Sequence, residues 1–200
     1  KIAVLSVEGV IYSSAGEMDM TRMLRAQLKR AREDKRVKAV VLKIDSPGGE
    51  VLASENIYAE IVKFQEETGK PVVASMGSVA ASGGYYVAAP CRWIVAHELT
   101  ITGSIGVIMH GYNYRGLMNK VGVRPEIYKS GKFKDMMSGD KDTESMSAEE
   151  RAIYEEERKM VQSLIMEAYG TFKDRIAKGW GKAAELNKAA NLGKGWTNYA

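Results

Sequence analysis

Short apolar runs and longer segments with helical spacing alternate along the first half of the chain. Three short runs predict strands, over residues 2–7, 37–44 and 72–76. Residues 18–34 carry apolar side chains on one helical face, and so do residues 53–64, which end before Gly69 and Pro71. Strands that alternate with helices need parallel crossover connections, so this half predicts an α/β fold with a mostly parallel sheet.

The second half of the chain predicts a less regular arrangement. It contains an apolar segment, a short strand and a polar, mobile loop, at residues 94–107, 125–129 and 136–146. Ser147 and Glu150 have the spacing of a capping box, which predicts the start of a long helix that runs to about residue 178. Its apolar side chains are spaced to pack on the core or on a partner subunit.

The composition fits a single α/β domain over residues 1–200. Hydrophobic residues make up 45% of the chain, which is enough for a sizeable core. The net charge of +4 is a modest excess of basic residues. The densest basic stripe lies on one helical face, at Arg22, Arg25, Lys29 and Arg32. Because no aromatic residues accompany this stripe, we expect a solvated face and no nucleic-acid partner.

The single cysteine and the two ends of the chain add little chemistry. Cys91 lies before an apolar stretch, which predicts a buried structural thiol and excludes an intrachain disulfide. No run approaches the roughly 18–20 apolar residues that cross a bilayer, so a soluble domain is expected. The chain starts in a predicted strand without methionine, and residues 191–200 are rich in turn residues. We therefore expect further segments beyond both ends.

Ser82 is the leading candidate for a catalytic residue. It is flanked by small residues, after the predicted strand that starts at Val72 and before a helix-compatible stretch. A serine in this position can present its hydroxyl beside free backbone N–H groups at a helix N-terminus. This is the way in which a nucleophile for acyl transfer is held.

A second glycine-rich turn, Gly48-Gly49, follows the predicted strand 37–44. Glycine lets backbone amides approach a ligand without interference from a Cβ atom. An oxyanion hole needs one N–H donor after the nucleophile and a second from a neighbouring loop. We therefore assign the two donors to Gly83 and Gly49, and expect Gly48 and Gly49 to contact the substrate.

The base that activates Ser82 is not evident from the residues alone. The two histidines, His97 and His110, carry no sequence signal of an Asp-oriented triad, and ordinary structural histidines account for both better. A lysine can serve only if burial lowers its pKa, since an exposed lysine is almost always charged at pH 7. The chain holds many lysines, and composition cannot choose between them.

Four sequence blocks that occur in order carry a resemblance to a known family. They are SPGG at residues 46–49, ASGGY at 81–85, TGSIGV at 102–107 and KSGKFKD at 129–135. Together they resemble the signal peptide peptidase A family, bacterial peptidases with a Ser/Lys dyad that are related in fold to ClpP and the crotonases. The resemblance covers about half of the chain and implies an α/β fold of ClpP/crotonase type.

The resemblance implies roles for three residues. Ser82 corresponds to the nucleophile and Lys134 to the general base, with Lys132 as its nearest rival. Ser104 corresponds to a hydroxyl that orients the lysine amine, although a loop serine that caps a turn is the alternative. The family's reaction implies neither a cofactor nor a metal.

The resemblance also implies partners and a location. Only one copy of each block is present, as in the family's short members, which form homo-oligomeric rings whose dyads are completed across subunits. We expect the long helix that starts after Ser147 to take part in the oligomer. The family implies an N-terminal membrane anchor outside this chain, an extracytoplasmic catalytic domain at the bacterial cytoplasmic membrane, and remnant signal peptides as substrates.

Three alternatives to this function stay open. A crotonase-like acyl-CoA enzyme would use the same paired amides with a carboxylate acid/base, and a serine at position 82 argues against it. A capsid-type protease of the same family and a non-catalytic scaffold are the others. An intact Ser82 and Lys134 argue against a scaffold.

Overall fold

The chain divides into two compact units. The computed structural model describes residues 1–13 and 19–190. Unit 1 comprises Lys1–Val107 and the chain from Tyr169 onward, and unit 2 comprises Ile108–Ala168. The turn-rich stretch at residues 191–200 and the predicted helix start at residue 18 lie outside the described residues. Each unit is described by itself below.

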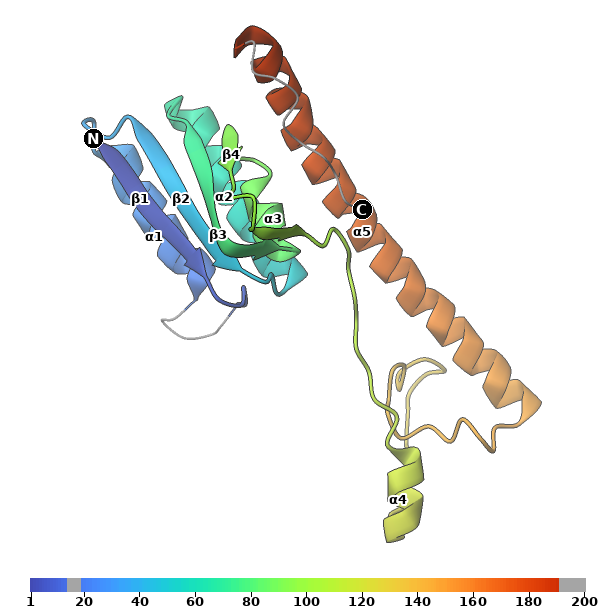
Figure 1. Cartoon of the computed structure of the whole chain (residues 1–200). Helices are drawn as coiled ribbons and strands as arrows, with labels where there is room; N and C mark the ends of the chain where they lie inside the picture. Colours follow the sequence, from blue (N-terminus) through green and yellow to red (C-terminus); the bar gives the residue numbers. More distant parts are fainter. Residues whose placement is uncertain (14–18, 191–200) are drawn as a thin grey trace. The chain divides into compact units, whose positions relative to one another are not determined.

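Unit 1 is built on a parallel sheet. Its strands are β1 (Ile2–Glu8), β2 (Ala39–Ser46), β3 (Val72–Ala81), β4 (Trp93–Val95) and β5 (Ile101–Gly103). The order is β1-β2-β3-β4, and β5 pairs with the last part of β3. All described pairs are parallel, which confirms the predicted sheet (Figure 1).

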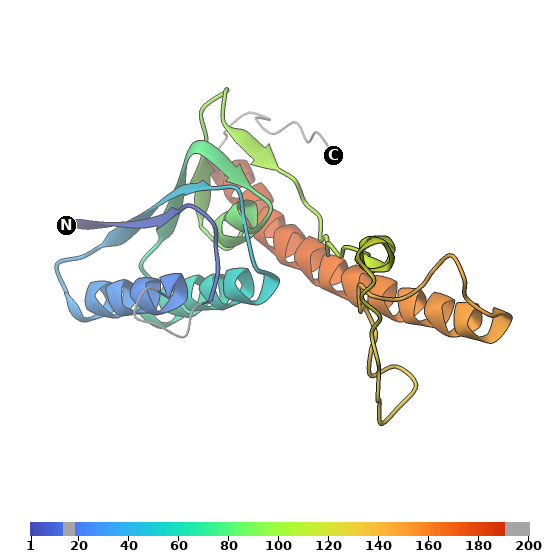
Figure 2. The same cartoon turned by 90° about the horizontal axis from the view of Figure 1, so that it is seen from below.

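Three helices connect the strands of unit 1. They are α1 (Met20–Glu33), α2 (Val51–Thr68) and α3 (Gly83–Ala88). Figure 2 shows α1 and α2 side by side on one face of the sheet. Asp19 caps α1, since its carboxylate accepts a hydrogen bond from the Thr21 N–H at 2.8 Å. Gly69 ends α2 in the left-handed conformation, as predicted.

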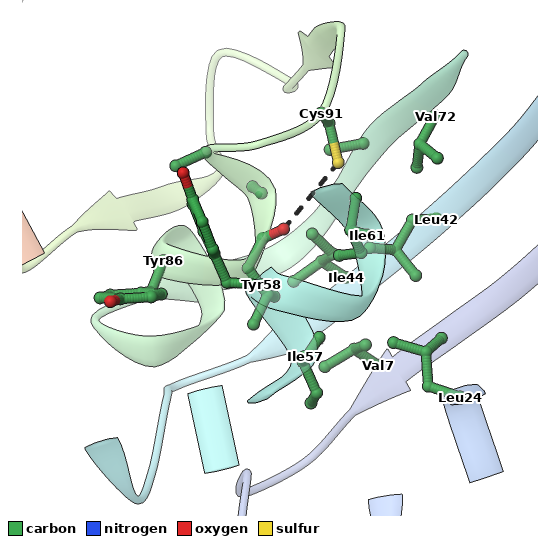
Figure 3. Close-up of a cluster of buried hydrophobic side chains, with 14 of the residues drawn as sticks. Val7, Leu24, Leu42, Ile44, Ile57, Tyr58, Ile61, Val72, Tyr86 and Cys91 are labelled. Carbon is green, nitrogen blue, oxygen red and sulfur yellow. Dashed lines mark hydrogen bonds between the residues drawn. The ribbon is translucent and has the colours of Figure 1, made fainter. Parts of the chain in front are cut away.

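The hydrophobic core lies between the sheet and these helices. Figure 3 shows that β1, β2, β3, α1 and α2 all contribute to it, for example through Val7, Leu24, Leu42, Ile57 and Val72. Alternate residues of β1 are buried and exposed, so the opposite face of this strand is open. The predicted strands β1 and β2 are therefore buried on one face only, the face of the sheet against which α1 and α2 pack.

Cys91 lies in the same core, as predicted. Its Sγ atom is 3.9 Å from the Val87 carbonyl oxygen, and the side chain is buried (Figure 3). Burial raises the pKa of the Cys91 thiol, because the thiolate would lose its hydration. This cysteine is therefore a structural residue and not a nucleophile.

Unit 2 contains α4 (Arg115–Val121), long irregular segments and the first part of α5 (Ala148–Ala190). The capping box is confirmed, since the Glu150 N–H donates to Ser147 Oγ at 3.2 Å and the Ser147 N–H donates to Glu150 Oε2 at 2.8 Å. Within this unit only Glu157 is classed as buried. Unit 2 thus has no apolar core of its own.

Several predicted boundaries differ from the structure. Strand β2 begins two residues later than expected, and β3 continues to Ala81 because its last residues pair with β5. The strand predicted at residues 125–129 is wrong, since unit 2 contains no strand with which it could pair. Helix α5 continues past residue 178 to Ala190. No described helix combines the length and the apolar composition needed to cross a bilayer.

The basic stripe of α1 faces solvent, as predicted. Arg22, Arg25 and Lys29 are exposed, and Arg32 pairs with Glu67 at 2.8 Å. Leu24 and Leu28 lie on the opposite face of the helix and are buried. This arrangement is that of an ordinary amphipathic helix.

Candidate active site

Ser82 lies directly between β3 and α3, in a strained backbone conformation. Its φ is 50° and its ψ is −120°, a region that residues with a side chain rarely adopt. Two hydrogen bonds hold it there: its N–H donates to the Gly103 carbonyl at 2.8 Å, and its carbonyl accepts from the Tyr86 N–H at 2.9 Å. The side chain of Ser82 is partly exposed. A sharp turn of this kind is typical of a nucleophile mounted between a strand and a helix.

The glycine turn after β2 packs against Ser82. Gly48 has a φ of +103°, and a Cβ atom on it would lie 2.6 Å from the Gly83 nitrogen and 2.9 Å from Ser82 Cβ. A Cβ atom on Gly83 would lie 3.2 Å from the Gly49 nitrogen. The two turns that the sequence singled out are therefore in contact, and both need glycine for this approach.

The backbone amides of Gly49 and Gly83 belong to the two turns that are in contact beside Ser82. In the bridge between Ile11 and Gly49, the Ile11 N–H donates to the Gly48 carbonyl at 2.9 Å, and the Glu50 N–H donates to the Ile11 carbonyl at 2.8 Å. The Gly49 N–H takes no part in these two bonds. The Gly83 N–H lies in the first turn of α3, where helical N–H groups have no intrahelical partner. Two such donors beside a serine can stabilise an oxyanion.

Ser104 directly follows Gly103, whose carbonyl accepts the hydrogen bond from the Ser82 N–H. Strand β5 pairs with the end of β3, so that Gly103 is in register with Ala81. The Thr102 hydroxyl donates to the Ala80 carbonyl at 2.7 Å and fixes this pairing. Ser104 is exposed and has a φ of 50°. The structure therefore brings together the regions of Ser82 and Ser104.

Lys134 belongs to unit 2, where it lies in the turns at residues 131–136. Its side chain is exposed. The neighbouring lysines of the same block are both in ion pairs, Lys129 with Asp135 at 2.8 Å and Lys132 with Glu156 at 2.6 Å. Among the described residues, no ion pair or hydrogen bond involves the Lys134 ammonium.

The two histidines lie in exposed positions. His97 belongs to unit 1, and its Nδ1 atom accepts a hydrogen bond from the Leu99 N–H at 3.1 Å. His110 belongs to unit 2 and is exposed there. In unit 1, the His97 imidazole is thus used for a local turn.

A cluster of three polar residues links α2, α3 and α5 within unit 1. Glu55 of α2 accepts a hydrogen bond from the Tyr86 hydroxyl of α3 and two from Arg175 of α5, of which one is 3.2 Å long. Burial raises the pKa of the Tyr86 hydroxyl, and the Glu55 carboxylate raises it further. No pattern along the chain predicts this cluster, because Glu55 and Arg175 are 120 positions apart.

Replacement of Glu55 by glutamine is expected to lower the free energy of unfolding by about 1–3 kcal/mol. The reason is that the hydrogen bonds from Arg175 and Tyr86 are weaker to a neutral amide than to a carboxylate. Thermal and urea unfolding would measure this change. Glu67→Gln on the same helix is the matched control, since the Glu67 side chain is 43% exposed and its partner Arg32 is 35% exposed. We expect a change within about 0.5 kcal/mol for this control. Equal losses in the two variants would contradict a special role of Glu55.

Comparison with protein families gives two matches. The model of peptidase family S49 matches residues 64–199, and the model of Clp protease matches residues 3–98. The first match includes Ser82, Ser104 and Lys134. The parallel sheet with its helices and the second match confirm the predicted α/β fold of ClpP type.

Two relatives with more than 30% sequence identity have names of peptidases. The signal peptide peptidase SppA of Enterococcus faecium is 41% identical over 90% of this chain and 51% of its own length. The chloroplastic serine protease SPPA of Arabidopsis thaliana is 36% identical over 98% of this chain and 28% of its own length. A ClpP1 structure from Listeria monocytogenes is 18% identical, with a TM-score of 0.36 over 44% of this chain and 46% of its own. The chain thus spans about half the length, or less, of these relatives.

Proposed function

Because the chain belongs to peptidase family S49, we propose that it is a serine endopeptidase that hydrolyses unfolded peptides, with Ser82 as its nucleophile. The observation that carries the proposal is the strained turn at Ser82 beside the amides of Gly49 and Gly83. A crotonase-like acyl-CoA enzyme would use similar amides, but the family match favours a peptidase.

The proposed reaction uses a Ser/Lys dyad. Ser82 Oγ attacks the peptide carbonyl carbon, and its proton passes to the neutral amine of Lys134. The N–H groups of Gly49 and Gly83 stabilise the resulting oxyanion. The intermediate then expels the amine of the leaving peptide, which receives the proton from Lys134. Water attacks the acyl-enzyme in the same way and restores Ser82.

Lys134 is the best candidate for the base among the lysines of its block. A general base must be neutral, and a carboxylate partner keeps a lysine protonated. Lys129 and Lys132 each have such a partner, at 2.8 Å and 2.6 Å, whereas no described carboxylate pairs with Lys134. In the proposed site, the Ser104 hydroxyl orients the Lys134 amine.

The proposal includes an assembly in which neighbouring subunits complete each site. Lys134 is exposed within unit 2, and the desolvated surroundings that a lysine base needs would come from a neighbouring subunit. Unit 2 exposes many large apolar side chains, as an interface would, among them Ile108, Tyr112, Leu117, Val121, Tyr128 and Leu164. We propose a homo-oligomeric ring with the dyad completed between chains.

The proposed substrates are remnant signal peptides, bound extended along Gly48 and Gly49. This substrate class agrees with the name of the Enterococcus relative, a signal peptide peptidase. It places the enzyme at the bacterial cytoplasmic membrane with its catalytic part on the extracytoplasmic side, held by an anchor outside this chain. Neither a metal nor a cofactor takes part in the proposed reaction.

Labelling with a peptidyl phosphonate tests the nucleophile directly. We expect a single covalent adduct on the peptide that contains Ser82, identified by mass spectrometry after proteolysis. Ser104→Ala serves as a control, because it keeps the nucleophile and should still form the adduct. An adduct on another residue, or labelling that persists in Ser82→Ala, would overturn the assignment.

A further inference from the structure

The one buried side chain of unit 2 is a carboxylate. Glu157, on the first part of α5, is only 3% exposed. Its Oε1 atom accepts a hydrogen bond from Lys141 Nζ at 2.6 Å, and the side chain of Lys141 is 11% exposed. A buried ion pair is a poor source of stability, because desolvation of both charges offsets their attraction. The burial of the Lys141–Glu157 pair, where apolar side chains could pack instead, therefore needs an explanation other than stability.

This ion pair continues into the block that carries Lys134. Lys141 Nζ lies 3.9 Å from Asp135 Oδ2, and Asp135 Oδ1 accepts a hydrogen bond from Lys129 Nζ at 2.8 Å. The bond from Lys129 keeps the pKa of the Asp135 carboxyl below its usual value, so this group is ionised at neutral pH. Asp135 directly follows Lys134 in the sequence. The charges therefore hold the backbone beside the proposed base.

The same block is also tied to α5 by the Lys132–Glu156 ion pair, but this pair is 48% exposed on both sides. The block's own backbone hydrogen bonds are local turns, from the Lys134 N–H to the Gly131 carbonyl at 3.2 Å and from the Met136 N–H to the Phe133 carbonyl at 3.1 Å. A turn without a sheet or helix around it tolerates several conformations. Three of the four charged side chains, those of Lys129, Asp135 and Lys141, also line a pocket of about 350 Å³.

We infer that the Lys141–Glu157 ion pair is a positioning element that fixes Asp135, and through it Lys134, at the place from which Lys134 accepts the proton of Ser82. This inference rests on the proposed function. Glu157 and Lys141 contact neither substrate nor reacting atoms in this scheme and act through Asp135. Displacement of a catalytic group by about 1 Å can lower a rate about 10²-fold, so a modest change in this block has a large effect.

Glu157→Gln tests the inference in the full chain, with an activated peptide ester as the substrate. We expect kcat to fall about 10-fold to 100-fold with KM unchanged, because the base is misplaced while substrate contacts remain. Glu156→Gln is the matched control on the same helix, since its pair with Lys132 is 48% exposed on both sides. We expect this control to stay within about twofold of the unmodified chain.

Measurements in the Lys134→Ala variant distinguish a positioning role of Glu157 from a general effect on stability. In Lys134→Ala, where no base is left to position, Glu157→Gln should cause no further loss of ester hydrolysis. A further loss of similar size in that background would overturn the inference, and so would a fall of kcat that comes with a higher KM and a lower melting temperature. The exchanged pair Lys141→Glu with Glu157→Lys should not recover kcat, because the new carboxylate at position 141 would face the Asp135 carboxylate, and recovery in this folded variant would count against the inference. Full activity of Lys134→Ala would instead overturn the proposed dyad, and the inference with it.

Discussion

Ser82→Ala and Lys134→Ala are each expected to lower the rate of peptide hydrolysis at least about 10³-fold. Without the hydroxyl no acyl-enzyme forms, and without the amine no group takes the hydroxyl proton. The combined variant should be no worse than either single variant, because the two residues act as one unit. Cleavage of an unstructured fluorogenic peptide measures these rates, with circular dichroism as the check on folding.

Lys132→Ala is the control for this experiment. Lys132 lies two positions from Lys134, but its ammonium is paired with Glu156 and its side chain is 48% exposed. Loss of an exposed pair has a small effect, so we expect most of the activity to remain. If Lys132→Ala were inactive and Lys134→Ala active, the base would be Lys132 and the assignment of Lys134 would be wrong.

Gly48→Ala is expected to lower kcat about 10²-fold to 10³-fold, the usual effect of a lost oxyanion donor. The new Cβ atom would lie 2.6 Å from the Gly83 nitrogen and so would push this amide away from the oxyanion position. The φ of +103° adds strain for any residue with a side chain, so the melting temperature should fall as well. Peptide hydrolysis and thermal unfolding measure the two effects separately.

Gly170→Ala is the matched control for Gly48→Ala. Gly170 lies inside α5, and a Cβ atom there meets nothing within 4 Å. Alanine is favoured over glycine within a helix by about 1 kcal/mol, so this variant should be active and at least as stable as the unmodified chain. If phosphonate labelling and kcat of Gly48→Ala matched those of Gly170→Ala, the glycine turn would have no part in catalysis.

Features that depend on neighbours in sequence could be predicted well. The capping box of Ser147 and Glu150 and the helix end at Gly69 each depend on a few adjacent residues, and both are confirmed. The glycine turns before α2 and α3 could also be located, because close backbone approach leaves glycine as the only choice. Their mutual contact follows from the parallel order of β2 and β3.

Features that depend on distant partners could not be predicted. Residues 125–129 have the composition of a strand, but a strand forms only where another strand offers free hydrogen-bonding groups. The Glu55–Arg175 and Lys141–Glu157 pairs join residues far apart in sequence, and a single charged residue on a helix has no pattern that names its partner. These two pairs become evident only in the three-dimensional structure.

The backbone at position 82 also bears on how this chain evolves. A serine with a φ of 50° is less stable than a glycine at the same place, by about 1–3 kcal/mol. A population selected only for folded protein would therefore drift towards glycine there. In the proposed function, selection for chemistry keeps the hydroxyl, and the rest of the core supplies the stability that this one residue removes.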